Sequence, residues 1–138
     1  MEEDAFDKII RREIPAEILY EDERTLAFLD IAPNTPGHTL VIPKNHVVNV
    51  FDTDDETFEA VMRTVRKIAP AVRDAVGAKG VHINSNHGPE AGQVVPHLHM
   101  HIIPRHDKSE FEFWPHGEYA PGEGAEVANK IREKISAT

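Results

Sequence analysis

The 138-residue sequence contains no cysteine. Disulfide bonds and thiolate metal sites are therefore excluded, while the redox compartment of the protein stays undetermined. Long apolar runs are also missing, because no stretch approaches the ~20 apolar residues of a membrane-spanning helix. We therefore expect no membrane partner.

Positive charge is scarce as well. Lys and Arg number 15 against 24 Asp and Glu, which gives a formal net charge of −9. This excess of negative charge argues against nonspecific binding to nucleic acid, so we expect no nucleic-acid partner. The first ten residues, MEEDAFDKII, are acidic and lack the basic-then-apolar order of a signal peptide. We expect a cytoplasmic protein.

The spacing of apolar residues predicts three helices and five strands. The helices are expected over residues 5–12, 53–77 and 125–135, and the strands over residues 17–22, 25–31, 38–43, 79–86 and 97–104. Pro70 should kink or break the long middle helix. Short links between strands favour antiparallel pairing. The predicted fold is α+β: one domain with a five-stranded, mainly antiparallel sheet, a long helix and short terminal helices.

The stretch HLHMHII, residues 97–103, alternates histidine with apolar residues. In a strand, alternate side chains point to opposite faces. His97, His99 and His101 should therefore line one face, and the apolar residues between them the other. Two interpretations fit this spacing equally well. The histidines could hold a metal ion, or one could act as a nucleophile that the others orient.

The loop HGPEAGQ, residues 87–93, directly precedes the histidine stretch. Its two glycines could let backbone N–H groups face an anion. It lacks the Lys-Ser/Thr pair of a Walker loop, and a strand rather than a helix follows it. A phosphate held beside imidazole would use such a loop, whereas a metal ion would not. The loop therefore favours the nucleophile over the metal.

The stretch HLHMHII resembles the signature of the histidine triad (HIT) family of nucleotide hydrolases and transferases. Residues 6–46 resemble its Hint-like branch, the purine nucleoside phosphoramidases, whereas GPEAGQ resembles the Fhit-like branch, which cleaves dinucleoside polyphosphates. The resemblance implies a nucleotidyl-histidine intermediate on His99. It also implies that His97 orients His99, that His101 faces phosphate oxygens or the leaving group, and that His38 hydrogen-bonds into the triad.

The resemblance also implies contacts with an AMP-containing purine nucleotide. Asn86, eleven residues before His97, would lie beside the phosphate, and Asp30 would bind the ribose hydroxyls. Asp30 could instead cap a turn. Two further groups are expected to bind the substrate. The phosphate would contact Gly92, Gln93 and Val94, and the base would contact Phe6, Ile9, Phe28 and Ile31. Taken singly, each of the four apolar residues is more simply explained as part of the core.

The sequence departs from the family pattern at two points, and each departure leads to a prediction. Val94 stands where Hint-like proteins have a serine, so a hydroxyl donor to the phosphate or leaving group is missing. Some prokaryotic relatives hold a structural zinc partly through cysteines, and with none in this chain we expect no metal site. The resemblance implies no cofactor.

We assign residues 1–110 to the HIT catalytic domain and residues 111–138 to a tail of the same domain. A homodimer is implied by the family, and Trp114 in the tail could pack on its own domain or reach a partner's site. The leading expectation is a nucleoside phosphoramidase. The alternatives are a diadenosine polyphosphate hydrolase, a catalytically weak nucleotide-binding module and a metal carrier.

Overall fold

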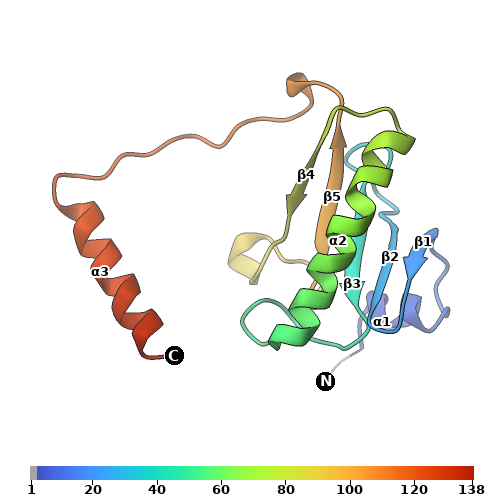
Figure 1. Ribbon diagram of the computed structural model, residues 1–138, viewed down its shortest axis with the longest axis horizontal. Coiled ribbons are helices and arrows are strands. Elements are labelled where there is room, and N and C mark those ends of the chain that lie inside the picture. Colours follow the sequence, from blue (N-terminus) through green and yellow to red (C-terminus); the bar gives the residue numbers. More distant parts are fainter. Residues whose placement is uncertain (1–2) are drawn as a thin grey trace.

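The computed structural model describes residues 3–138 and has the predicted order of elements (Figure 1). Its helices are α1 (Ala5–Ile10), α2 (Asp55–Ala75) and α3 (Glu123–Ser136), and its strands are β1 (Ile18–Glu21), β2 (Thr25–Leu29), β3 (Thr39–Pro43), β4 (Gly80–Asn84) and β5 (Met100–Arg105). The strands form one antiparallel sheet in the order β1-β2-β3-β5-β4. The α+β prediction is confirmed.

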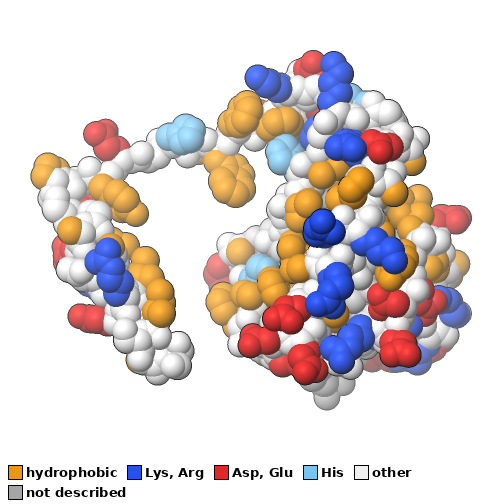
Figure 2. Space-filling view, in the orientation of Figure 1, with side chains coloured by type: hydrophobic (Ala, Val, Ile, Leu, Met, Phe, Trp, Pro, Cys, Tyr) orange, Lys and Arg blue, Asp and Glu red, His pale blue; other side chains and the backbone are white. Residues whose placement is uncertain are grey.

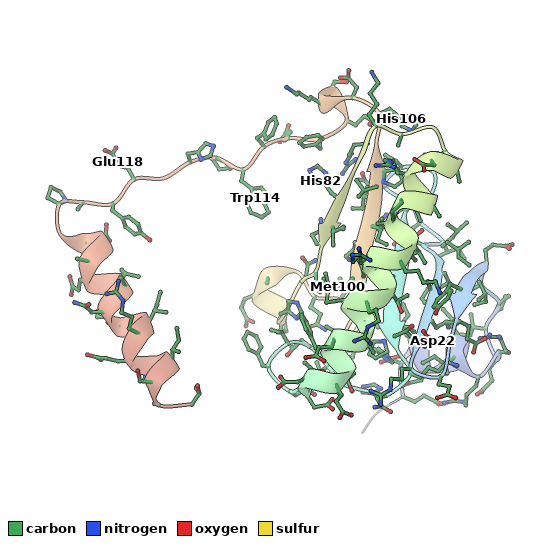
Figure 3. The ribbon with its side chains drawn as sticks, viewed as in Figure 1. Asp22, His82, Met100, His106, Trp114 and Glu118 are labelled. Atoms are coloured by element: carbon green, nitrogen blue, oxygen red, sulfur yellow. The ribbon has the colours of Figure 1, made fainter. Side chains whose placement is uncertain are left out.

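Helix α2 covers one face of the sheet because its apolar residues recur at helical spacing. Val61, Val65 and Ile68 of this stripe are buried against the sheet. The opposite side of the same core includes Leu98 and Met100. Figure 3 shows Met100 behind α2. Each fully buried aliphatic side chain contributes about 1.5–3 kcal/mol to the free energy of unfolding. The apolar positions of HLHMHII therefore belong to the core, as their alternation predicted.

Helix α1 packs on the other face of the sheet. Asp4 caps it, and a reciprocal capping box joins Asp4 and Asp7: each backbone N–H donates to the other residue's carboxylate, at 3.1 and 2.9 Å. Phe6 and Ile9 of α1 are buried in a second apolar cluster, and Phe6 meets Phe28 edge-to-face at a centroid distance of 5.5 Å. Helix α1 is thereby fixed beside the histidine face.

The last strand is shorter than predicted. Strand β5 begins at Met100, whereas residues 97–104 were expected to be extended and paired. The pairing with β3 runs only from Thr39↔Ile102 to Val41↔Met100. Before it, the Leu98 N–H donates 2.8 Å to the Val47 carbonyl, in the segment after β3. The first part of the motif therefore lies against a loop and leaves the sheet ladder.

The prediction of a break at Pro70 is wrong, because α2 is continuous to Ala75. A proline removes one helical hydrogen bond and leaves the carbonyl four residues earlier without its donor. Here both Pro70 and Arg66 are exposed, so water can reach that carbonyl. The neighbouring Ile68, Ala69 and Val72 stay buried in the core and hold the helix in place.

An extended segment carries α3 away from the sheet (Figure 1). Figure 2 shows hydrophobic side chains exposed along this segment and along one side of α3. They include Phe113, Trp114, Tyr119, Ile131 and Ile135, and Trp114 is 87% exposed. Figure 3 shows Trp114 projecting from the segment, so it does not pack on its own domain. Within the described part of the chain, no helix combines the length and apolarity needed to cross a membrane.

Candidate active site

The three histidines of the motif lie together on the α1 side of the sheet. Phe6 contacts both His97 and His99, with ring centroids at 5.8 and 5.1 Å, and the His99 and His101 rings lie 5.0 Å apart. The alternation therefore brings the three imidazoles together, as predicted. Their hydrogen bonds differ, and these bonds decide what each ring can do.

One ring nitrogen of His99 is hydrogen-bonded to the backbone, and the other is available to react. Its Nδ1 lies 2.7 Å from the carbonyl oxygen of His97, and an oxygen can only accept, so Nδ1 carries the proton. The Nε2 lone pair then points away from the backbone. Ser85 Oγ donates 2.8 Å to the carbonyl of His99 and fixes the peptide from the other side. Burial lowers the pKa of His99, which keeps the imidazole neutral near pH 7.

His101 is set in the opposite tautomer by a chain of hydrogen bonds. The backbone N–H of Asn34 donates 3.0 Å to His38 Nδ1, so the proton of His38 lies on Nε2. That nitrogen lies 2.9 Å from His101 Nδ1 and donates to it, which leaves the proton of His101 on Nε2. Burial lowers the pKa of His101 to about 4, helped by His99 and His38. His101 therefore offers an N–H donor next to the lone pair of His99.

A cleft of about 650 Å³ opens beside this face, and all four expected base-wall residues line it. Phe6, Ile9 and Phe28 are buried in the core as well as lining the cleft, so the core interpretation holds and their contact with a base stays a prediction. Ile31 is 97% exposed and can only form the rim. Ligand sites of this size and largely apolar lining are common for small molecules. The cleft could take a base and its sugar.

Asp30 stands at the mouth of the cleft. Its Oδ1 accepts from the Ala32 N–H at 2.9 Å, which is the turn-capping role considered from the sequence. Its Oδ2 lies 3.7 Å from His38 Nε2. From one position, the carboxylate of Asp30 caps a turn, faces the His38 ring and borders the cleft. Burial lowers the pKa of His38, and Asp30 partly offsets this effect.

The loop of residues 87–93 is held in place by its own hydrogen bonds. Gly88 and Gly92 adopt positive φ angles of 99° and 89°, which favour glycine. The N–H groups of Ala91, Gly92 and Gln93 donate to carbonyls of the same loop, and that of Gly88 donates 2.9 Å to Gln93 Oε1. The expectation that this loop exposes its N–H groups is therefore wrong for these four. Among the described residues, the loop's hydrogen bonds leave the Val94 N–H unused.

Gln93 and Asn86 make contacts inside this region. The Gln93 amide donates to the Val48 and Val95 carbonyls at 2.7 and 3.1 Å, so its side chain braces the loop. Asn86 Nδ2 donates 3.3 Å to the Gly92 carbonyl. The Val94 side chain is 90% exposed. Contacts between these residues and a substrate stay predictions.

A polar group that the sequence patterns did not predict surrounds His97. His97 is fully buried, its Nε2 lies 2.9 Å from the Pro43 carbonyl, and its Nδ1 faces Asp4 and Asp7. His46 completes the group, with Nδ1 2.7 Å from Asp7 Oδ2. Burial raises the pKa of Asp7, but hydrogen bonds from the Asp4 backbone and His46 outweigh it and lower the pKa overall. The Asp-x-x-Asp spacing at the start of α1 was the available signal.

The fold and site together define a histidine-lined site on one face of an antiparallel sheet, beside an apolar cleft. Comparison with known proteins places the chain in a family. Residues 11–108 match the HIT domain model, and the chain belongs to this family of nucleotide-binding proteins and hydrolases.

Three similar proteins illustrate the range of the family. The adenosine 5′-monophosphoramidase hnt1 of Schizosaccharomyces pombe is 37% identical over 92% of this chain and 97% of its own length. The crystal structure of a HIT family protein from Bacillus subtilis is 43% identical, covers 94% of both chains and has a TM-score of 0.86. The structure of a zinc-bound histidine triad protein from Mycobacterium smegmatis is 36% identical, covers 96% of both chains and has a TM-score of 0.74.

Proposed function

We propose that this protein hydrolyses purine nucleoside 5′-phosphoramidates through a covalent nucleotidyl-histidine on His99. The observation that carries the proposal is the hydrogen bond from His99 Nδ1–H to the His97 carbonyl, which leaves the Nε2 lone pair available on a ring that contacts Phe6 of the cleft wall. The similarity to the S. pombe monophosphoramidase supports the choice of substrate.

In the first step, His99 Nε2 attacks the α-phosphorus and a P–N(imidazole) bond forms. The substrate's P–N bond breaks, its electron pair goes to the leaving nitrogen, and that nitrogen takes up a proton from the solvent. We expect the Nε2–H of His101 to hydrogen-bond a phosphate oxygen as charge develops there. Phosphoryl transfer depends mainly on such positioning and charge stabilisation.

In the second step, water attacks the same phosphorus. A P–O bond forms, the P–N(imidazole) bond breaks, and the lone pair returns to His99 Nε2. The proton that the water releases balances the one taken up by the amine. Splitting one difficult displacement into two easier ones is the general advantage of a covalent intermediate.

We assign substrate contacts as the resemblance implies. Phe6, Ile9, Phe28 and Ile31 would hold the base, and Asp30 Oδ2 would accept from a ribose hydroxyl. Asn86 and the loop residues Gly92, Gln93 and Val94 would border the phosphate. Because the loop's hydrogen bonds use the Gln93 side chain internally, we expect the Val94 N–H to be the loop donor nearest the phosphate.

The test is AMP release from adenosine 5′-phosphoramidate at neutral pH. The wild-type chain should turn over, and His99→Ala should lose activity by at least about 10³-fold, since it removes the nucleophile. His106→Ala is the matched control, because this exposed histidine lies beyond the end of β5 (Figure 3). An intact substrate with the wild-type protein, or full activity in His99→Ala, would refute the proposal.

The loop GPEAGQ, which resembles the Fhit-like branch, supports a second candidate from the same family. Its substrate would be a diadenosine polyphosphate, and valine at the serine position weakens the case for amide cleavage. Turnover of both substrates by one preparation decides between them: a negligible rate on the dinucleotide removes this candidate. Tight AMP binding without turnover of either would indicate a binding module.

We also propose that the chain works as a homodimer. The exposed aromatic residues of the tail, Trp114 among them, lack cover within their own chain. A cavity between α2 and β4 is lined by apolar residues such as Met62 and Ile83. Sedimentation at micromolar concentration should give twice the chain mass of 15.5 kDa, and a monomeric mass would contradict the proposal.

A further inference from the structure

Arg105 ends strand β5 on the face of the sheet that carries the triad. Side chains alternate along a strand, so Arg105 lies on the same face as His101, four residues and therefore roughly 13 Å further along β5. The pairing of β4 with β5 sets His82 opposite Ile103, next to Arg105 on this face. Any effect of Arg105 on the triad therefore passes through the residues that its side chain contacts.

Three contacts fix the orientation of the Arg105 guanidinium. Its Nε–H donates 3.0 Å to His82 Nδ1, and its Nη1–H donates 2.7 Å to Asn34 Oδ1. The ring of Phe111, at the start of the tail, lies 5.4 Å from Arg105 Cζ and meets His82 edge-to-face at a centroid distance of 4.4 Å. Figure 3 shows His82 near the point where the tail leaves the sheet. Because a guanidinium is planar, these contacts also fix the direction of the N–H that Asn34 accepts.

Asn34 connects this guanidinium to the histidine chain. Its side chain accepts from Arg105, and its backbone N–H donates 3.0 Å to His38 Nδ1. The next residue, Thr35, donates its Oγ1–H over 2.9 Å to the Pro104 carbonyl, so two successive residues of this segment are tied to the end of β5. Asn34 is exposed, so burial does not hold it, and these two ties set the direction of its N–H.

A neutral His38 has two tautomers, and the Asn34 N–H selects between them. With the proton on Nε2, His38 accepts from Asn34 and donates to His101 Nδ1 over 2.9 Å. With the proton on Nδ1, the N–H of Asn34 would face a second N–H, and His101 would have to donate from its own Nδ1. His101 would then present a lone pair on Nε2 beside the lone pair of His99, and the donor toward a phosphate would be lost.

Two charges act on His38 in opposite directions. Asp30 Oδ2 lies 3.7 Å from His38 Nε2, beyond hydrogen-bonding distance, and its charge favours a proton on that nitrogen. Burial lowers the pKa of His38 most, Asp30 raises it, and the charge of Arg105 lowers it. Arg105 therefore helps to keep His38 neutral, and only a neutral His38 can accept from the Asn34 N–H. Because Asp30 also favours Nε2–H, loss of Arg105 should shift the tautomer populations without inverting them.

We propose that Arg105 is a positioning residue for the reaction. It holds Asn34 so that the protons of His38 and His101 both lie on Nε2. His82 supports Arg105 from the neighbouring strand. The inference rests on the proposed function, because the donor on His101 matters to catalysis only where a phosphate binds beside it.

Nitrogen NMR of isotope-labelled protein tests the tautomers without any activity assay. Long-range proton–nitrogen spectra of the wild type near neutral pH should show His38 and His101 protonated on Nε2 and His99 on Nδ1. In Arg105→Gln, His38 and His101 should both gain an Nδ1–H population of at least about a tenth. The proton of His99 should stay in place, because the His97 carbonyl sets it. Unchanged nitrogen shifts of His38 and His101 in this variant would overturn the proposal.

Turnover of adenosine 5′-phosphoramidate tests whether the arrangement matters to the reaction. Arg105→Gln should lower kcat by about three- to tenfold and leave KM nearly unchanged, since the lost donor acts as charge develops in the transition state. Arg105→Lys should recover little of this loss, because an ammonium lacks the fixed fork with which a guanidinium reaches two acceptors. The matched control is Arg24→Gln, an exposed arginine that lies 3.7 Å from Glu56, and it should turn over as wild type.

Asn34→Ala tests the link from the other side, because it removes the acceptor of Arg105 and keeps the backbone N–H. It should reproduce both effects, and combining it with Arg105→Gln should add nothing, since the two residues act in series. It also serves where Arg105→Gln destabilises the end of β5. A lower kcat with unchanged tautomers, or altered tautomers with wild-type kcat, would overturn the proposal. A wild-type chain that leaves the phosphoramidate intact would refute the proposed function instead, and the NMR comparison would still decide whether Arg105 sets the proton of His101.

Discussion

At the level of single residues, hydrogen bonds set which nitrogen of each active-site imidazole carries its proton. The His97 carbonyl places the proton of His99 on Nδ1, and the chain from Asn34 through His38 places that of His101 on Nε2. A lone pair and an N–H donor therefore stand side by side, with ring centroids 5.0 Å apart. Two residues of the same type acquire different roles because their backbone surroundings differ.

The burial of His101 predicts loss of stability in acid. Its pKa falls from the ordinary 6.5 to about 4 in the folded chain, so the unfolded state binds more protons between these values. Stability should be complete above about pH 6.5 and should fall as the pH drops toward 4. With allowance for partial exposure, His101 accounts for about 1–3 kcal/mol of this fall.

Urea unfolding at pH 7, 5.5 and 4.5 measures this fall, with His101→Gln as the comparison. The variant lacks the titrating ring and should lose less stability between pH 7 and 4.5. Equal pH dependence in both chains would show that His101 is not responsible.

We expect the substitution of Val94 by serine to raise activity on the phosphoramidate. Val94→Ser supplies the hydroxyl that Hint-like relatives carry at this position, and should raise kcat/KM for the phosphoramidate by about tenfold if each hydrogen bond in the transition state is worth roughly 1–1.5 kcal/mol. Because the side chain is 90% exposed, the free energy of unfolding should hardly change. Val94→Ala is the control for size alone. A rate no higher than that of Val94→Ala would mean that serine makes no such contact here.

At the level of elements, the alternation in HLHMHII was enough to predict both faces of the segment. Leu98 and Met100 lie in the core under α2, and the histidines face α1. The Asp-x-x-Asp spacing indicates that Asp4 and Asp7 lie together at the start of α1. Their approach to His97 could not be predicted, because it depends on where a short helix docks, about ninety residues away in sequence. Similarly, nothing local to GPEAGQ reveals that its N–H groups are used by its own carbonyls and by Gln93.

Helix α2 offers a test of how tertiary packing overrides local preference. Pro70 lies on the exposed side of a helix whose buried stripe continues past it. Pro70→Ala should restore one helical hydrogen bond. Alanine is favoured over proline in helix interiors by about 3 kcal/mol, and the greater freedom of the unfolded chain offsets part of this. A net gain of about 1–2 kcal/mol is expected.

The midpoint of urea unfolding, at constant slope, measures the gain. Arg66→Ala, one turn earlier on the exposed side, is the matched control and should change stability by less than about 0.5 kcal/mol. Loss of stability in Pro70→Ala would mean that the proline ring contributes packing of its own.

At the level of the whole molecule, apolar side chains are buried between α2 and the sheet but exposed in the C-terminal tail. Helix α2 and the sheet bury their apolar residues against each other, whereas α3 and the segment before it expose theirs (Figures 1 and 2). Exposed apolar surface of this kind usually marks an interaction site. A second copy of the chain is the partner that the family resemblance implies.

Trp114 makes this association measurable, because it is the single tryptophan of the sequence. In an isolated chain it is 87% exposed and should emit at the long wavelength of hydrated indole. If the tail packs on a partner, the emission should shift to shorter wavelength as the protein concentration rises, in parallel with the sedimenting mass. A chain that ends at residue 122 keeps Trp114 and lacks α3, and it should shift only at higher concentration. An emission maximum that stays constant while the mass doubles would show that the dimer forms without the tail.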